Sequence, residues 1–263
     1  MVKRGKMDWA LILGGSSGLG LASANKLASH GFNICIIHRD PRARMPEIEQ
    51  EFSQMRANNV RVETFNADAL HVQKRNGILL ELCKILDQNG RIKVLIHSIA
   101  KGNLKPMMSA DKNELQNDDF GLTTNAMAIS LYDWTKALIN QSLFASDARV
   151  ISFTSEGNTK VWRNYAAVSA AKASLEAITR SMAVEFAHLG LRCNCIQAGV
   201  TDTASFRMIP GSEKIKEITL KRNPFGRLST PQDVANAVYL LSLDEASWIN
   251  GTVIKVDGGE HLS

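Results

Sequence analysis

The chain has 263 residues, of which 44% are hydrophobic and 22% are charged, so it can bury a complete hydrophobic core. No low-complexity stretch suggests a second domain, and we expect a single α/β domain over residues 1–263. The net charge of +5 is a modest excess. Without a run of interleaved basic and aromatic residues, it does not indicate nucleic-acid binding. The apolar runs have the length of strands and are too short to cross a bilayer.

The cysteines and the N-terminal residues bear on the cellular compartment. Four cysteines in a chain of this size do not make a disulfide framework. Cys193 and Cys195 stand two apart in a predicted strand, where we expect two buried small hydrophobic groups and no metal site. Residues 1–7 are basic and are not followed by the core of a signal peptide. The sequence therefore predicts a cytoplasmic protein without a membrane segment.

Strand-like apolar runs alternate with amphipathic helical stretches, which is the pattern of βαβ units around a parallel sheet. We therefore predict a single-domain Rossmann fold, a doubly wound seven-stranded parallel sheet with helices on both faces. Two long helices are predicted over 115–144 and 165–189. The longest irregular stretch is 199–227, interrupted by Pro210 and Pro224, and such segments are usually functional. The predicted strands cover 10–13, 33–37, 60–66, 94–98, 149–154, 192–197 and 252–256.

A glycine-rich turn follows the first predicted strand and opens a helix. Gly14 permits a tight turn, Gly18 lets a pyrophosphate approach the backbone, and Gly20 lets the helix pack on the sheet. The N-terminus of the helix then faces the phosphate. A glycine-rich turn can also be an ordinary loop, but its place at the first strand–helix junction favours dinucleotide binding. The predicted binding turn comprises Gly14, Ser16, Ser17, Gly18, Leu19 and Gly20.

The end of the second predicted strand bears on the choice of cofactor. An acidic side chain there would bind the adenosine ribose hydroxyls, but this chain has His38 and Arg39, with Arg42 and Arg44 close behind. These cations suit a ribose 2′-phosphate, although the negative charge of Asp40 partly offsets their positive charge. We expect NADPH in preference to NADH, with a solvated basic loop as the alternative.

Asp68 ends the third predicted strand. Its carboxylate could accept a hydrogen bond from the adenine amino group of a bound cofactor. It could equally cap the helix that is predicted from Leu70 onward. The sequence leaves both possibilities open.

Tyr165 and Lys172 stand seven positions apart in a predicted helix. Seven residues make about two turns and rise roughly 10 Å, so both side chains can face one groove that holds a cofactor ribose. The ammonium would lower the pKa of the phenol and hold the ribose hydroxyls. The phenol would donate to an oxygen that gains negative charge. Tyrosine and lysine share helix faces by coincidence in many enzymes, but the glycine-rich turn favours the catalytic interpretation.

Together these motifs resemble a short-chain dehydrogenase/reductase over nearly the whole chain. Most members of that family place the tyrosine and the lysine four apart. The six residues between them here are similar to the enoyl-acyl-carrier-protein reductases. The resemblance is carried by Gly14, Gly18, Gly20, Asp68, the segment 97–100, Asn125, Tyr165, Lys172, Ala198, Gly199, Thr203 and the segment 256–259.

Ser155 departs from the pattern of many enoyl reductases, which have a second tyrosine ten positions before the catalytic one. A serine there resembles the NADPH-using branch of these enzymes and also resembles ordinary ketoreductases. His97 and Ser98, in place of the usual double asparagine, are again similar to enoyl reductases. The resemblance thus implies an NADPH-dependent enoyl-[acyl-carrier-protein] reductase of fatty acid biosynthesis. The alternative is a ketoreductase such as a 3-oxoacyl-[acyl-carrier-protein] reductase.

The resemblance also implies a role for each site residue. Tyr165 would stabilise the enolate formed when hydride reaches the β-carbon of a trans-2-enoyl thioester, and Lys172 would bind the ribose. The implied catalytic residues are Tyr165, Lys172, Ser155 and Asn125. The implied cofactor-binding residues are Gly14, Ser16, Ser17, Gly18, Leu19, Gly20, Arg39, Asp68, Ala69, Ser98, Ile99, Ala100, Tyr165, Lys172, Gly199, Thr201 and Thr203.

Residues 200–226 would form the substrate-binding loop, with Phe206, Met208 and Ile209 as apolar wall. The enoyl thioester would be carried by acyl carrier protein or by coenzyme A. The family resemblance further implies a homotetramer in which the two long helices pair across a symmetric interface. Basic residues of the loop could face an acidic carrier protein or only solvent, and they are Lys214, Lys216, Lys221 and Arg222.

Overall fold

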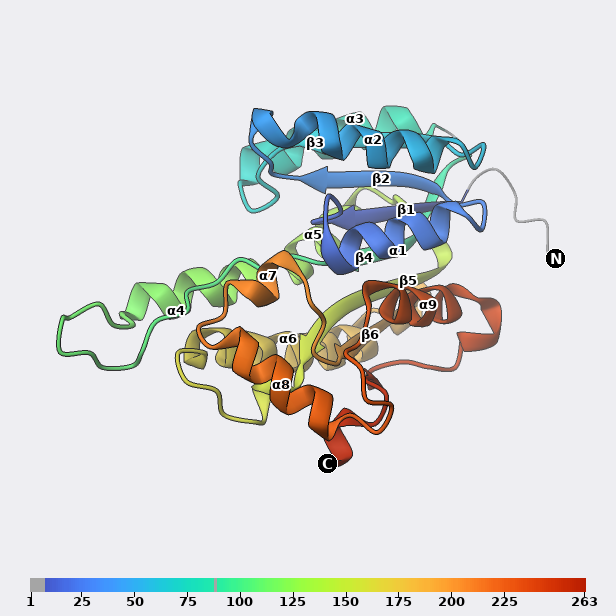
Figure 1. Ribbon diagram of the computed structural model, residues 1–263. Helices are drawn as coiled ribbons and strands as arrows, with labels where there is room; N and C mark the ends of the chain where they lie inside the picture. The colour runs from blue at the N-terminus through green and yellow to red at the C-terminus, as the bar shows by residue number, and fades with distance from the viewer. Residues whose placement is uncertain (1–7, 88) are drawn as a thin grey trace.

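Seven strands of the computed structural model pair side by side in the order β3-β2-β1-β4-β5-β6-β7, and every neighbouring pair is parallel (Figure 1). The structure describes residues 8–87 and 89–263, so the basic residues 1–7 lie outside the described part. The strand order reverses between β1 and β4, which opens a crevice at their carboxyl ends. The predicted fold class is confirmed. The strands are β1 Asp8–Leu13, β2 Asn33–His38, β3 Val62–Asn66, β4 Arg91–His97, β5 Phe144–Ser155, β6 Leu191–Ala198 and β7 Val253–Val256.

Successive residues of the central strand β1 pack into two separate cores, because side chains alternate between the two faces of a sheet. Leu11 and Leu13 belong to the core under α3 (Val72–Leu86), α5 (Ser130–Asn140) and α6 (Ala166–Glu185). Ala10 and Ile12 belong to the opposite core, under helices α1, α2 and α9. A sheet covered on both faces needs apolar residues at consecutive positions, which explains the continuous apolar runs of the sequence. The covering helices of the second face are α1 Gly18–Ala28, α2 Met45–Arg56 and α9 Pro231–Ser242.

The long helix predicted over 115–144 is divided in the structure. Its first part, α4 (Asn117–Thr124), continues through a π-helical turn at Asn125–Ile129 into α5, which ends at Asn140. Ser142 then adopts a left-handed backbone conformation with φ of +53°, and Phe144 already pairs with Ile92 as the first residue of β5. The prediction was therefore too long at its C-terminal end.

The prediction of an irregular stretch over 199–227 is also wrong in part. Two helices lie within it, α7 (Ala204–Arg207) and α8 (Ser212–Arg222). The side chain of Thr203 caps α7 by accepting a hydrogen bond from the Phe206 amide at 3.2 Å. Pro210 precedes α8 and Pro224 follows it, so the prolines mark the ends of a helix and do not disrupt its interior.

The cysteines lie where the sequence places them. All four are free, and Cys193 and Cys195 are buried on β6 in the same core. Burial raises the pKa of both thiols, so both are neutral and packed as small hydrophobic groups. Within the described residues, no helix combines the length and the apolar character that a membrane span requires.

Candidate active site

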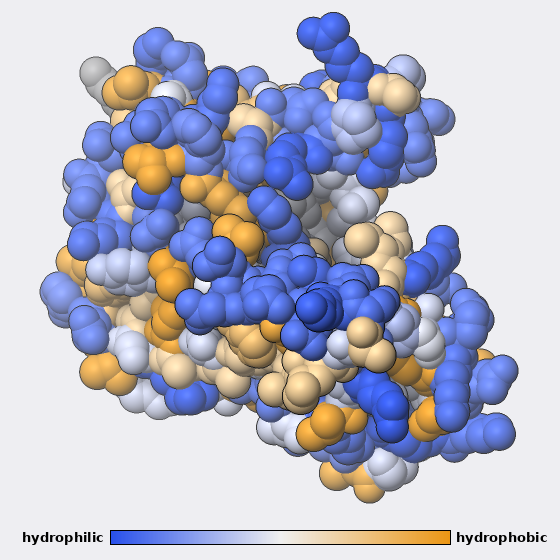
Figure 2. Space-filling view, turned by 90° about the vertical axis from the view of Figure 1, so that its left-hand side faces the viewer, coloured by the Kyte–Doolittle hydropathy of each residue, from blue (hydrophilic) through white to orange (hydrophobic). Residues whose placement is uncertain are grey.

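The carboxyl ends of the strands border a cavity of about 490 Å³. Figure 2 faces this edge of the sheet and shows a hollow between hydrophilic side chains above and a more apolar region below. The wall combines the turn after β1, the ends of β2, β4 and β5, helix α6 and the segment after β6. All of the predicted site residues line this cavity except Gly20 and Asn125.

The glycine-rich turn brings three backbone segments into close approach. Gly14 has a φ of +85°, and a Cβ atom on it would lie 2.5 Å from the backbone oxygen of Ser98. A Cβ atom on Gly20 would overlap the backbone oxygen of Gly14. Gly20 therefore lies outside the cavity, where it lets α1 pack closely on the Gly14 turn, whereas the sequence analysis expected it to serve packing on the sheet.

The first residue of α1 leaves its backbone open toward the cavity. Gly18 has a φ of +55°, and the nearest atom to its missing Cβ is Cγ2 of Thr203, 3.6 Å away across the space. Ser17 precedes the helix without making a side-chain cap. The amides of a first helical turn lack intrahelical acceptors, so this uncapped end next to a bare glycine backbone fits a phosphate group.

Arg39 and Asp68 form an ion pair at the far end of the cavity. Nη1 of Arg39 lies 3.0 Å from Oδ2 of Asp68, and the Arg39 side chain is 58% exposed. The other Asp68 oxygen accepts a hydrogen bond from the Leu70 amide at 2.9 Å. Partial burial alone would raise the pKa of Asp68, but the Leu70 amide and the Arg39 charge hold it below its ordinary value. Asp68 does not cap a helix, because α3 begins only at Val72 and His71 is its N-cap residue. Its carboxylate instead binds the Leu70 amide in the preceding turn and the Arg39 guanidinium.

The neighbouring carboxylate, Asp40, is neutralised by other groups. Its two oxygens lie 3.0 Å from Nδ1 of His38 and 2.9 Å from Nη1 of Arg44, and its side chain is only 8% exposed. Arg42 and Arg44 are not among the residues that line the cavity, whereas Arg39 is. The positive group that faces this part of the cavity is therefore Arg39.

Tyr165 is the N-cap residue of α6 and not a residue of its first turn. Its hydroxyl lies 3.4 Å from Oγ of Ser155, the last residue of β5. The phenol ring packs against Gly157, where a Cβ atom would come within 2.6 Å of it. Two turns along α6, Nζ of Lys172 donates a hydrogen bond to the Phe153 backbone oxygen at 2.7 Å. Two hydroxyls and one ammonium thus converge on one end of β5.

Burial is the largest influence on the pKa values of Tyr165 and Lys172. Burial raises the pKa of Tyr165, and the hydrogen bond with Ser155 offsets this only in part. Burial lowers the pKa of Lys172 to about 8, against the opposing effects of Cys195 and Glu176. The expectation that Lys172 lowers the phenol pKa is therefore wrong, because desolvation of the phenolate is the larger effect. Tyr165 stays protonated at neutral pH and acts as a hydrogen-bond donor.

Asn125 is the predicted catalytic residue that the structure does not bring to the cavity. It is exposed at the start of the π-helical turn, whereas Met127 is buried and lines the cavity. The wider turn sets the direction of these side chains, and the sequence gives no sign of it. His97 also lines the cavity, and its Nε2 lies 2.7 Å from the Ser130 hydroxyl. Burial and the Lys172 charge lower the pKa of His97 to about 3, so this histidine is neutral.

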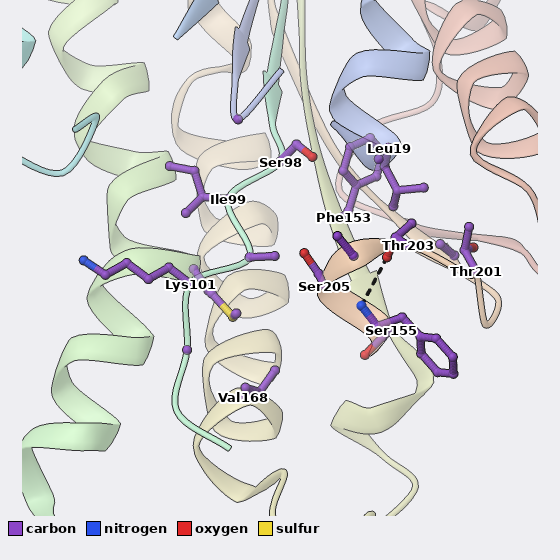
Figure 3. A pocket seen from close by; sticks show the side chains of 18 of the residues that line it. Leu19, Ser98, Ile99, Lys101, Phe153, Ser155, Val168, Thr201, Thr203 and Ser205 are labelled. Atoms are coloured by element: carbon purple, nitrogen blue, oxygen red, sulfur yellow. Dashed lines mark hydrogen bonds between the residues drawn. The ribbon is translucent and has the colours of Figure 1, made fainter. Parts of the chain in front are cut away.

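Several residues of the wall were missed by the sequence analysis. Met127, Val168 and Ala171 form a small apolar cluster against Tyr165. Trp162 also lines the cavity, and an aromatic residue just before the tyrosine was the available signal. In Figure 3 the long side chain of Lys101 points away from the group formed by the other labelled residues, although its backbone borders the cavity.

The sequence profile of the family described as "Enoyl-(Acyl carrier protein) reductase" matches residues 14–261. Among curated proteins, the chain is 29% identical over 267 residues to the "Probable 2,4-dienoyl-CoA reductase" of Bacillus subtilis, covering 96% of each chain. This relative therefore aligns with the chain from end to end.

Two solved structures have the same fold. The enoyl-[acyl-carrier-protein] reductase (NADH) of Aquifex aeolicus superposes with a TM-score of 0.83 at 23% identity, covering 98% of this chain and 99% of that one. A short-chain dehydrogenase of Burkholderia cenocepacia in complex with NADP superposes with a TM-score of 0.81 at 24% identity, covering 97% and 98%. The cavity at the edge of the sheet, the glycine-rich turn and the match to the family profile all indicate the same family. The chain therefore belongs to the short-chain dehydrogenase/reductase family, whose members are oxidoreductases that use a nicotinamide cofactor.

Proposed function

We propose that the protein is an NADPH-dependent enoyl-thioester reductase, acting on a trans-2-enoyl group carried by acyl carrier protein or coenzyme A in fatty acid biosynthesis. The observation that carries the proposal is the position of Tyr165 at the N-cap of α6. Val168, four residues before Lys172, lines the cavity where most family members have their tyrosine. The hydroxyl donor is therefore displaced along α6, away from the ammonium.

This displacement suits the geometry of an enoyl substrate. Three residues of helix correspond to about 4.5 Å along its axis. In a ketone, the carbon that accepts hydride is bonded to the oxygen that becomes negative. In an enoyl thioester, the β-carbon lies further from the thioester oxygen. A donor set back from Lys172 can hold that oxygen while the β-carbon occupies the hydride-accepting position.

The residues of the chain have distinct tasks in this mechanism. When bound, the nicotinamide supplies hydride to the β-carbon. The protonated Tyr165 hydroxyl would donate to the enolate oxygen, a charge that develops only during the reaction. Ser155, whose Oγ lies 3.4 Å from the Tyr165 hydroxyl, would donate to the same thioester group. Lys172 binds the ribose hydroxyls, and the start of α1 at Gly18 binds the pyrophosphate. Solvent returns the proton to the α-carbon.

A ketoreductase is the second candidate, and the Ser155–Tyr165 pair favours it. Two hydroxyls 3.4 Å apart can hold one carbonyl oxygen, with Tyr165 as the proton donor. This chemistry needs the same ribose-binding lysine. The two reactions differ in which carbon of the substrate receives hydride.

The segment 200–226 supports an acyl substrate. Phe206, Met208 and Ile209 line the cavity, as predicted, and provide apolar surface for a chain. Of the basic residues predicted to face a carrier protein, Lys216 lies 3.3 Å from Asp202 and Arg222 contacts Glu156. The exposed residues left for an acidic partner are Lys214 and Lys221.

Parallel assays with two thioesters test the function. With NADPH, crotonyl thioester should be reduced and acetoacetyl thioester should not. The reason is that the Tyr165 hydroxyl is placed for a substrate whose hydride-accepting carbon lies far from the oxygen that becomes negative. Oxidation of NADPH by acetoacetyl thioester alone would establish the ketoreductase. Turnover with neither would point to a nucleotide-sensing protein and would overturn the proposal.

Tyr165→Phe should lower the turnover number by about 10²–10³, the usual cost of losing one donor to a developing charge. NADPH binding, measured by quenching of protein fluorescence, should be nearly unchanged. Lys172→Ala should in contrast also weaken NADPH binding, because its ammonium holds the ribose in the ground state. Near-normal turnover of Tyr165→Phe would show that another group stabilises the enolate.

We propose NADPH as the preferred cofactor because Arg39 is the cation that faces the cavity at the end of β2. A charge-assisted bidentate contact with the 2′-phosphate is worth about 1.5–3 kcal/mol, or roughly ten- to a hundredfold in affinity. Arg39→Ala should raise the Michaelis constant for NADPH by that factor and leave the constant for NADH nearly unchanged. Equal losses with both cofactors in parallel titrations would mean that Arg39 supports the adenine pocket instead.

We also propose a homotetramer, following the family resemblance. Exposed apolar residues on α4 and α6, among them Leu122 and Val184, would be covered by symmetric pairing of these helices. Light scattering at micromolar concentration should give about four times the mass of one chain. A monomeric mass would contradict this assembly.

A further inference from the structure

The C-terminal end of helix α8 is joined to the rest of the molecule by Arg222. Its Nη2 lies 2.9 Å from both carboxylate oxygens of Glu156 and 2.7 Å from the backbone oxygen of Glu260. The side chains of Arg222 and Glu156 are 17% and 16% exposed. Removing one partner of an ion pair that is shielded from solvent to this degree is more disruptive than breaking an exposed surface pair. This contact therefore contributes to the attachment of the segment 200–226.

Little else on α8 anchors that segment. Of its eleven residues, Ile215 and Thr219 are buried. The Thr219 hydroxyl lies 3.4 Å from a carboxylate oxygen of Glu260, whose other oxygen accepts a hydrogen bond from the Val200 amide at 3.1 Å. The segment thus relies on a few polar contacts, and its apolar buried face is small.

The partner of Arg222 lies beside the catalytic hydroxyls. Glu156 directly follows Ser155 and opens the short helical turn Glu156–Asn158. Gly157 in this turn packs against the ring of Tyr165. On the other side, Asn158 hydrogen-bonds Glu176 of α6, one turn beyond Lys172. The turn 156–158 therefore lies between the substrate-covering segment and the two hydroxyls.

Arg222 also separates two negative charges. Burial raises the pKa of Glu260, and the nearby Glu156 raises it further, while the Arg222 charge opposes both effects. Without Arg222, the carboxylates of Glu156 and Glu260 would repel each other. Glu156 would keep its second cation, since Nζ of Lys160 lies 2.6 Å away on an exposed side chain. Loss of Arg222 would thus weaken the attachment of the segment while leaving Glu156 paired.

We infer, on the basis of the reductase activity proposed above, that Arg222 is a positioning residue: through Glu156, it couples the segment 200–226 to the placement of Ser155 and Tyr165. Arg222 itself does not line the cavity and so does not contact the reacting atoms. Small displacements of donor hydroxyls are costly for a reaction that depends on developing charge. Closure over an acyl chain and correct placement of the donors would then occur together.

The test compares Arg222→Lys, Glu156→Gln and the double variant with a matched control. Lysine keeps the charge but cannot hold Glu156 and the Glu260 carbonyl together, and glutamine keeps the shape without the charge. The control is Arg227→Lys. Arg227 forms an ion pair of similar type with Asp233 just beyond the segment and does not line the cavity.

Three quantities are measured for each variant: kcat and KM with the thioester, NADPH affinity by fluorescence, and amide hydrogen exchange. Each single variant should lower kcat by roughly tenfold, and the double variant should be no worse, because both changes remove one interaction. NADPH affinity should be unchanged. Exchange should rise together in residues 204–222 and 156–165, and the control should change none of these values.

Other results would overturn the inference. Additive losses in the double variant, or faster exchange in 204–222 alone, would show that the segment and the hydroxyls are not coupled. Faster exchange throughout the sheet in both single variants would mean that Arg222 serves only global stability. If the unaltered protein turns over neither thioester, the proposed function fails, and the exchange pattern alone then decides whether the coupling exists.

Discussion

Lys172 holds a buried ammonium group at one end of the cavity, where burial lowers its pKa to about 8 and the Phe153 backbone oxygen accepts one of its hydrogen bonds. Glu176, one turn further along α6, offsets only part of the cost of that burial. An ammonium has three donors, and the hydroxyls of a bound ribose are suited to those that remain. In the reaction proposed above, this one side chain would therefore fix where the ribose of the cofactor binds.

The remaining elements are arranged to let a dinucleotide reach Lys172. Parallel strands bring their carboxyl ends to one edge, and the reversal of strand order between β1 and β4 leaves room there. The close contacts of Gly14 with Ser98 and of Gly20 with Gly14 hold α1 against this edge, so its N-terminus faces the same space. The backbone at this edge would thus receive the phosphates of a dinucleotide, whereas the side chain of Lys172 would hold its ribose.

The sequence predicts well those features that depend on local pattern. The strands follow from apolar runs, and the glycine-rich turn, Tyr165 and Lys172 follow from spacing. Features set by tertiary structure were missed or wrong. The π-helical turn that exposes Asn125 and buries Met127 has no residue signature. Likewise, the phenol pKa of Tyr165 depends on how deeply it is buried, which spacing alone does not reveal.

Val168 gives the cavity an apolar wall close to Lys172. It fills the place one turn before Lys172 and packs with Met127 and Ala171, and Tyr165 lies against this cluster. An apolar surface there offers no hydrogen-bond donor to a carbonyl oxygen. In the proposed reaction, the oxygen of the substrate would instead be held by Tyr165 and Ser155. Those two hydroxyls lie at the junction of β5 with the turn 156–158, so in the proposed reaction their placement would depend on how firmly that turn is held.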